Sequence, residues 1–282
     1  MLASVRVLLA GLCTVDVVQR VDELPAPGHK VQSRSVEVAA GGPATNAAVT
    51  VAALGGEPTL LTVLGSHPLA ELARADLDAC GVAVRDALPG HTEPPAVSAV
   101  TVRDRDGERT VVSRNAAAVP DGLDAGALAD ADAVLVDGHH PELALAAARW
   151  ARRCGVPLVV DAGSWKPVFG EIFPLADVVA CSAHFSGPPG VLREVPVVIT
   201  TAGPGPVRWR TATGSGEVPV PEVTARDTLG AGDVWHGALA LRAGERDVGE
   251  SIEFANAVAA ERVRHVGPRA WLGPVRARMG VR

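Results

Sequence analysis

The chain has 282 residues, of which 48% are hydrophobic, 21% are charged and 3% are aromatic, and its formal net charge is −6. The hydrophobic content is sufficient for one large α/β domain or two ordinary ones. The acidic balance disfavours a nucleic-acid-binding protein, which would normally carry a basic excess. The apolar runs are shorter than the roughly 18 residues of a membrane span, so we expect no membrane partner.

In the first half of the chain, buried segments alternate with half-exposed ones. Strands are predicted at 4–12, 15–21, 31–38, 59–64, 97–102 and 109–113, and helices at 43–54 and 68–80. Pro43 suits the first turn of the first helix, and Gly55 with Gly56 suits its end. The Arg-Asp-Gly turn at 105–107 joins the last two strands and predicts a β-hairpin.

The second half alternates short apolar strands with helices. Strands are predicted at 133–136, 158–160, 177–180 and 197–200, a strand pair at 203–216, and helices at 141–154 and 234–241. This order predicts a parallel sheet covered on both faces, in a single domain spanning residues 1–282. Polar residues that follow these strands would gather at the carboxyl edge of the sheet, where α/β folds bind ligands. The half-exposed strands of the first half predict a small separate sheet.

The four cysteines are widely separated and form no C-x-x-C pair; they are Cys13, Cys80, Cys154 and Cys181. This spacing does not indicate a metal cluster or a redox motif. Each cysteine lies in apolar sequence, so we expect buried, reduced thiols and a cytoplasmic protein.

The segment most informative about chemistry is residues 226–241, RDTLGAGDVWHGALAL. Gly230 and Gly232 bracket Ala231 in a turn that leads into a helix, where free backbone N–H groups would bind an anion. Asp233 lies beside these groups and is suited to accept a proton from a sugar hydroxyl that attacks a phosphoryl group. An ordinary helix cap is the alternative interpretation of Asp233.

Residues 227–233, DTLGAGD, resemble the D-T-x-G-A-G-D signature of the ribokinase, or PfkB-type, carbohydrate kinases. Residues 41–48, GGPATNAA, resemble the sugar-binding turn of the same family, and the likeness extends over nearly the whole chain. It implies a ribokinase-like three-layer α/β sandwich, in which helices flank a central, mostly parallel sheet. It also implies a small β-sheet lid drawn from about 13–40 and 96–115, and by analogy a homodimer formed through that lid.

The activity implied by the resemblance is transfer of the γ-phosphoryl of ATP to a hydroxyl of a monosaccharide, ketohexose or pentose like. Asp233 would be the catalytic base, and the anion hole would consist of Gly230, Ala231 and Gly232. The residues expected to hold sugar hydroxyls are Asp16, Gly42 and Asn46. The residues expected to bind ATP are Thr201, Gly203, Asp227, Thr228, Gly230, Gly232 and Asn256.

Four further residues are candidates for substrate binding. His139 follows a predicted strand at the active edge, where it either contacts substrate or caps the next helix. Lys30, Arg109 and Asn115 lie on or beside the predicted lid strands, where basic groups could bind a phosphate or sulfonate on the substrate. Solvated lid charges are the commoner explanation, so a neutral sugar is preferred to an anionic one.

The metal site departs from the family pattern. Many members carry an N-x-x-E motif near the nucleotide, tied to magnesium, but here Ser182 and Phe185 occupy those two positions. Mg²⁺ is still expected with ATP, because it neutralises the phosphates and keeps most of its waters. Its protein ligands are unassigned, with Asp161 and Asp227 as candidates, and a monovalent-cation requirement is left open.

Two alternative functions remain. A nucleoside kinase of the same superfamily would share these motifs, although a chain with no tyrosine and four phenylalanines has few rings to stack on a base. The absence of N-x-x-E could instead mark a non-catalytic sugar sensor, against which the intact 227–233 run argues.

Overall fold

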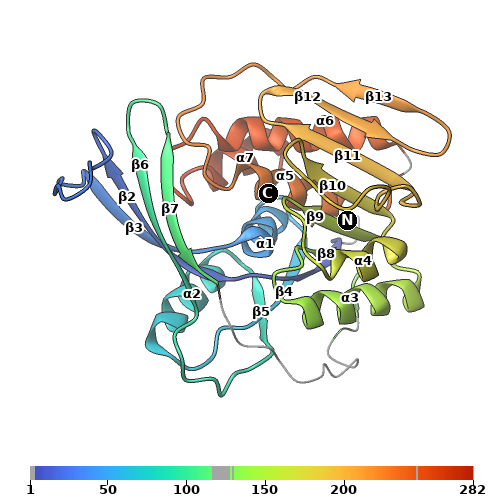
Figure 1. The fold of residues 1–282 in the computed structure, drawn as a ribbon, viewed down its shortest axis with the longest axis horizontal. Helices are drawn as coiled ribbons and strands as arrows, with labels where there is room; N and C mark the ends of the chain where they lie inside the picture. The colour runs from blue at the N-terminus through green and yellow to red at the C-terminus, as the bar shows by residue number, and fades with distance from the viewer. Residues whose placement is uncertain (1–3, 116–127, 129, 246, 282) are drawn as a thin grey trace.

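The computed structural model describes residues 4–115, 128, 130–245 and 247–281. These residues form a large sheet with helices on both faces and a separate four-stranded sheet that projects to one side (Figure 1). The predicted three-layer α/β architecture with a small additional sheet is therefore confirmed. None of the helices in this part of the chain combines the length and apolarity that crossing a membrane requires.

The large sheet has the strand order β13-β12-β11-β10-β9-β8-β1-β4-β5. The strands are β1 (Arg6–Ala10), β4 (Glu57–Thr62), β5 (Ala83–Asp86), β8 (Ala133–Val136), β9 (Leu158–Ala162), β10 (Val178–Ser182), β11 (Val197–Ala202), β12 (Gly205–Arg210) and β13 (Ser215–Val218). The strands from β11 to β5 in this order all pair in parallel, whereas β12 pairs antiparallel with both β11 and β13 at one edge. β1 pairs with both β4 and β8, so the chain continues in opposite directions from it, and ligands bind at such switch points.

Helices cover the two faces of this sheet (Figure 1). One face carries α1 (Pro43–Ala53), α2 (Pro68–Ala79), α5 (Ala231–Leu241), α6 (Val248–Arg262) and α7 (Leu272–Met279). The other carries α3 (Pro141–Cys154), α4 (Phe169–Ile172) and the short 3₁₀ helix η2 (Phe173–Leu175). The four residues of β8, AVLV, are all buried, so this strand is apolar on both faces and requires helices on both sides of the sheet.

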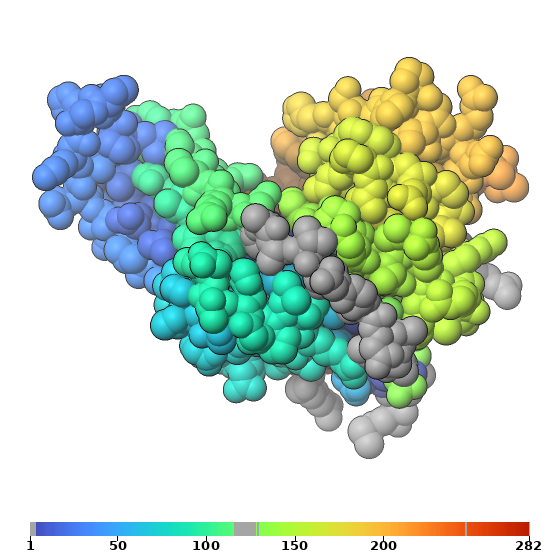
Figure 2. All heavy atoms as spheres, turned by 60° about the horizontal axis from the view of Figure 1, so that its bottom comes forward, coloured from blue at the N-terminus to red at the C-terminus, as the bar shows by residue number. Residues whose placement is uncertain are grey.

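The small sheet, called the lid below, consists of β3 (Ser35–Gly41), β2 (Thr14–Val21), β6 (Ala96–Arg103) and β7 (Arg109–Arg114), in that order. β6 and β7 form the predicted antiparallel hairpin, and β2 joins β6 in parallel. Figure 2 shows the surface hollowed between the lid, in blue and green, and the yellow and orange region that contains β10 to β13.

Several details differ from the sequence prediction, which also gave no helix at α4 or α7. The strand predicted at 31–38 begins at Ser35, because the preceding residues form an exposed loop. β5 was not predicted, since its four residues, AVRD, are too few and too mixed for a periodic pattern. Cys154 is exposed at the end of α3, whereas Cys13, Cys80 and Cys181 are buried as expected.

Candidate active site

The site begins with an unusually close contact between α1 and α5. A β-carbon at Gly237 of α5 would lie 2.5 Å from the carbonyl oxygen of Ala47 and 2.9 Å from Cβ of Thr50, both on α1. Only glycine fits there, and the two helices therefore approach backbone to backbone. This contact, one helical turn from Asp233, brings α1 to the start of α5.

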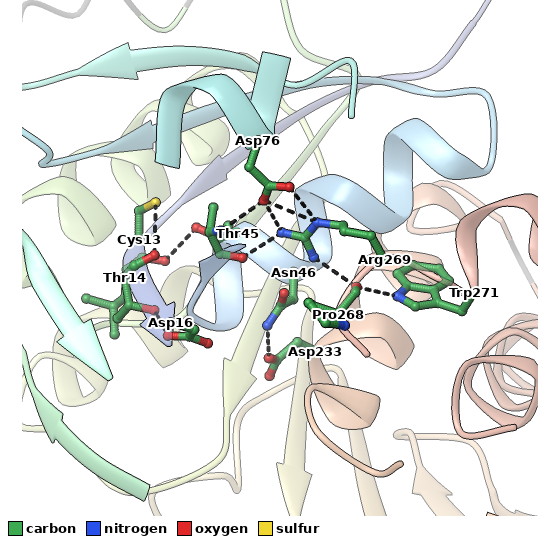
Figure 3. Close-up of polar contacts among 12 residues, drawn as sticks. Cys13, Thr14, Asp16, Thr45, Asn46, Asp76, Asp233, Pro268, Arg269 and Trp271 are labelled. Atoms are coloured by element: carbon green, nitrogen blue, oxygen red, sulfur yellow. Dashed lines mark hydrogen bonds and ion pairs between the residues drawn. The ribbon is translucent and has the colours of Figure 1, made fainter. Parts of the chain in front are cut away.

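Asn46 and Asp233 meet across this contact. Nδ2 of Asn46 donates a hydrogen bond of 2.8 Å to Oδ2 of Asp233 (Figure 3). Burial, and then the negative charge of Asp161, raise the pKa of Asp233 to about 6, while the hydrogen bond from Asn46 opposes this rise. Asp233 is thus a more basic carboxylate than usual and is still ionised near neutral pH, which suits a proton acceptor.

The turn before α5 supplies the candidate anion hole. Gly230 has a φ of 71°, in the left-handed region, and a β-carbon there would lie 3.2 Å from Nδ2 of Asn46. The amide of Ala231 donates to the carbonyl of Thr228 at 3.3 Å, so it already has an acceptor. Among the residues described, the amides of Gly230, Gly232 and Asp233 have no acceptor in the protein and are available to a ligand.

A pocket opens beside the Asn46–Asp233 pair, with about 340 Å³ of empty volume that is partly open to solvent. Asp16 on β2, Asn46 and Gly230 line it together with apolar side chains of the lid and the body. Oδ1 of Asp16 accepts a 2.5 Å hydrogen bond from Thr14. Burial raises the pKa of Asp16, and the hydroxyls of Thr14 and Ser98 oppose this effect.

Two glycines shape the side of the pocket that Asp16 lines. A β-carbon at Gly41 would lie 2.0 Å from Oδ2 of Asp16, so glycine is required for that carboxylate to fit. Gly42 has a φ of 97°, and a β-carbon there would lie 2.4 Å from the carbonyl oxygen of Leu12. The predicted residues Asp16, Gly42, Asn46, Gly230 and Asp233 are therefore brought together.

Asp137 joins the strands of the switch point to α1. Oδ2 accepts from the amides of Leu12 and Ala44, at 2.9 and 3.1 Å, and Oδ1 accepts from the amide of His139 at 2.9 Å. Burial alone would raise the pKa of Asp137, but the adjacent His139 ring and these amides hold it well below its usual range. His139, with Nδ1 3.2 Å from Oδ1 of Asp137, lies at the active edge as predicted, but its role toward substrate is untested.

His236 was missed by the sequence analysis. It is buried one turn into α5, with Nδ1 2.7 Å from the carbonyl oxygen of Gly232 and 3.5 Å from Oδ2 of Asp161. It therefore connects the first turn of α5 to the end of β9. Histidine belongs to no motif at this position, so only the fold reveals the contact.

Two predicted ATP-binding residues are engaged by the protein itself. The buried carboxylate of Asp227 accepts from the amides of Leu229 and Gly267, both at 3.0 Å. Asn256 is 2% exposed, donates to the carbonyl of Pro219 and accepts from Nε1 of Trp235. These contacts favour structural roles for both residues, so we leave them out of the proposed nucleotide site.

The other predicted residues lie nearer the surface. Thr201 is the last residue but one of β11, and Gly203 lies in the exposed turn that follows, with a φ of 58°. Nη1 of Arg109, on lid strand β7, donates to the hydroxyl of Thr228 at 2.8 Å, so the lid contacts the signature loop. Lys30 and Asn115 are exposed at the lid, and their contact with substrate stays a prediction.

Phe185 is packed among aromatic rings, with its ring centroid 6.3 Å from that of Trp165. Within the described ranges, no group of three or more His, Cys, Asp or Glu side chains is arranged to bind a metal ion.

Comparisons with known proteins show which family the chain belongs to. The sequence model of the pfkB family carbohydrate kinases matches residues 5–184 and 191–272. An ATP-dependent ribose-1-phosphate kinase from Halopiger xanaduensis is 31% identical over 280 residues, and the match covers 94% of each chain. A ribokinase from Bacillus subtilis is 25% identical over 269 residues, covering 90% of this chain and 91% of its own.

The fold agrees as well. A solved structure from Agrobacterium tumefaciens, provisionally described as a ribokinase, has a TM-score of 0.85 at 25% identity, covering 99% of this chain and 98% of the other. Because the family model spans most of the sequence and the relatives match it nearly end to end, the chain belongs to the pfkB family of carbohydrate kinases.

Proposed function

We propose that this protein transfers the γ-phosphoryl group of ATP to a hydroxyl of a pentose-type monosaccharide, with Asp233 as the general base. The observation that carries the proposal is the Asn46–Asp233 hydrogen bond at the mouth of α5, beside a pocket that Asp16 also lines. The family match and the names of the two relatives, both of them ribose-type kinases, support a sugar acceptor and ATP as the donor.

Different groups in the site bind the sugar, accept the proton and stabilise the transferring phosphoryl group. Asp16 and Asn46 hold hydroxyls of the sugar, since a carboxylate accepts hydrogen bonds and an amide both donates and accepts. Asp233 takes the proton as the acceptor oxygen attacks the γ-phosphorus, and the bond from that phosphorus to the bridging oxygen breaks to release ADP. The amides of Gly232 and Asp233 stabilise the negative charge on the transferring group.

Magnesium would arrive with the nucleotide, bound mainly by phosphate oxygens and water. The carboxylates described here form no cage for it, and Asp227 is fully engaged by backbone amides and Arg20. Asp161 is the carboxylate whose charge acts most strongly on Asp233, so we propose it as an outer contact of the hydrated ion. A monovalent-cation requirement is left open.

A second candidate acceptor is a pentose that carries a phosphate, as in the name of the Halopiger relative. Most cations around the pocket are paired with carboxylates: Arg20 and Arg262 flank Asp227, and Arg269 pairs with Asp76. Arg109 differs, because its guanidinium donates a hydrogen bond to the hydroxyl of Thr228. A guanidinium so placed at the lid is suited to a phosphate on the sugar.

An acceptor panel tests the proposal. ADP release from MgATP would be measured with ribose, ribose 1-phosphate, fructose and adenosine, each with and without K⁺. We expect turnover with ribose or ribose 1-phosphate and none with adenosine. If ribose 1-phosphate is the acceptor, Arg109→Met should raise its KM about tenfold or more, in line with the loss of one charge-assisted hydrogen bond. Sugar binding without turnover for every acceptor would instead identify a sensor.

We also propose that the lid forms a homodimer. Strand alternation places Asp16 on the face of the lid toward the pocket and Val17 on the opposite face. Val38, Val17, Ala99 and Val112 are direct neighbours in register across that outer face. Val38 is 47% and Val112 72% exposed. A second copy of the chain would cover this apolar row.

The Val112→Glu variant is therefore expected to be monomeric while the wild type is a dimer, as measured by light scattering coupled to size exclusion at several concentrations. A charge buried against an apolar partner costs several kcal/mol, which is enough to dissociate a modest interface. Leu72→Glu is the matched control, because Leu72 is an exposed apolar residue of α2 and is not part of the apolar row on the outer face of the lid. A monomeric wild type, or a dimeric Val112→Glu variant, would contradict the proposal.

A further inference from the structure

Lysine is rare in this protein. Of the 26 lysine and arginine residues, only Lys30 and Lys166 are lysines. Lys30 is exposed in the loop between β2 and β3, but Lys166 is half-buried in the loop between β9 and α4. Nearly all the cationic side chains are therefore arginines, yet this half-buried position carries a lysine. The lysine ammonium is more compact and more strongly hydrated than the arginine guanidinium, so the two are not equivalent there.

The loop that carries Lys166 lies at the carboxyl edge of the large sheet. A β-carbon at Gly138, just beyond β8, would come within 3.2 Å of Cδ of Lys166, so the lysine stem crosses the end of that strand. Its Nζ lies 5.2 Å from the centroid of the Phe169 ring. The stem therefore spans the ends of β8 and β9, the edge at which Asp137 and Asp161 lie.

An aromatic cluster holds this loop in place. Trp165 packs edge-on against Phe169, Phe173 and Phe185, with ring centroids 6.1 to 6.3 Å apart, and Phe169 stacks on Phe173 at 5.1 Å. The residue next to Lys166 is thus fixed by three rings. A cation on such a support is ordered before any ligand binds, which lowers the entropic cost of using it.

The same two carboxylates, Asp137 and Asp161, act on both Lys166 and Asp233. Among the residues described, no carboxylate oxygen lies within 4.0 Å of its Nζ, so the ammonium has no ion-pair partner. Burial lowers the pKa of Lys166, and the charges of Asp137 and Asp161 oppose this shift. The same two aspartates raise the pKa of Asp233. Lys166 and Asp233 therefore share one acidic edge.

An incoming triphosphate needs positive charge at this edge. It would meet the carboxylates of Asp137, Asp161 and Asp233, whereas the amides of α5 offer only partial positive charge on one side. We propose that the ammonium of Lys166 binds an oxygen of the terminal phosphoryl group of ATP, so that this group lies between Lys166 and the amides of α5. This assignment rests on the proposed kinase function.

Because the chain has two lysines, the ammonium can be observed directly. Reductive ¹³C-methylation keeps the charge and labels both lysine side chains together with the N-terminal amine, and the Lys166→Arg variant identifies the Lys166 signal. We expect the Lys166 signal to shift with Mg²⁺ and AMP-PNP, a non-hydrolysable ATP analogue, and to shift much less with Mg²⁺ and ADP. An identical response to both nucleotides would overturn the assignment and leave Lys166 a packing residue against Phe169.

Kinetics provide a second readout. Lys166→Met should lower kcat/KM for ATP about 10- to 100-fold, as expected for a lost charge-assisted hydrogen bond, while KM for the sugar and the Kd of ADP stay within about twofold. Lys166→Arg should keep part of the kcat/KM that Lys166→Met loses. The control is Arg152→Met, a change at an exposed position of α3, which should leave kcat and KM at their wild-type values. A raised KM for the sugar instead would overturn the assignment to ATP. If AMP-PNP does not bind the wild type at all, the proposed function fails together with this inference.

Discussion

The Asp233→Asn variant is expected to lose about three orders of magnitude or more in kcat, with Kd values for sugar and nucleotide within a fewfold of the wild type. Asparagine preserves the shape of the side chain and can still hydrogen-bond to Asn46, but it cannot accept the proton of the attacking hydroxyl. A positioned general base typically contributes about 10²- to 10⁴-fold. Single-turnover kinetics with saturating MgATP and the best acceptor would measure the loss.

The pH dependence of the wild type provides an independent measurement of the same role. Because the pKa of Asp233 is raised to about 6 and only its ionised form is a base, kcat/KM should fall as the pH drops through about 6. The control is Asp78→Asn, an equally conservative change at an exposed position of α2, which should leave kcat and its pH profile unchanged. Turnover within tenfold of the wild type in Asp233→Asn would remove Asp233 from the mechanism.

Much of the fold could be predicted because its signals are local. A few neighbouring residues are enough to predict an apolar strand such as β8 or the Arg-Asp-Gly turn between β6 and β7. The strand pattern of the lid predicted half-exposure and hence a separate sheet. β5 escaped prediction because a four-residue strand at a sheet edge alternates too briefly to be distinguished from a loop.

The site was only partly predictable, because its geometry depends on contacts between distant segments. Asn46 and Asp233 are 187 residues apart, and only the resemblance to a family placed them together. Gly237, which allows their helices to touch, looks like an unremarkable glycine inside a helix. Lys166 and His236 belong to no recognised motif, and the fold alone brings them to the edge where Asp161 lies.

Asp137→Asn is expected to reduce the free energy of unfolding by about 3 kcal/mol, although the change is nearly isosteric. The carboxylate now accepts hydrogen bonds from the amides of Leu12 and Ala44 at one oxygen and from the amide of His139 at the other. In either orientation of the asparagine, its NH₂ group would therefore face a backbone N–H, which is also a donor. A buried donor without an acceptor costs about 1–3 kcal/mol, and the loss of charged hydrogen bonds adds to this. For a chain of this size the melting temperature should fall by about 6 °C or more.

Asp132 provides the matched control for this prediction, because Arg6 lowers the pKa of its carboxyl to about 2 while its side chain stays 45% exposed. An exposed ion pair contributes at most about 1 kcal/mol, so Asp132→Asn should change stability far less than Asp137→Asn. The pKa of Asp137 lies below its usual value, so its contribution is present above about pH 4 and is lost as the pH falls further. The difference in the free energy of unfolding between the wild type and Asp137→Asn should therefore become smaller in acid. If Asp132→Asn and Asp137→Asn lose equal stability at pH 7, burial does not determine the size of the effect.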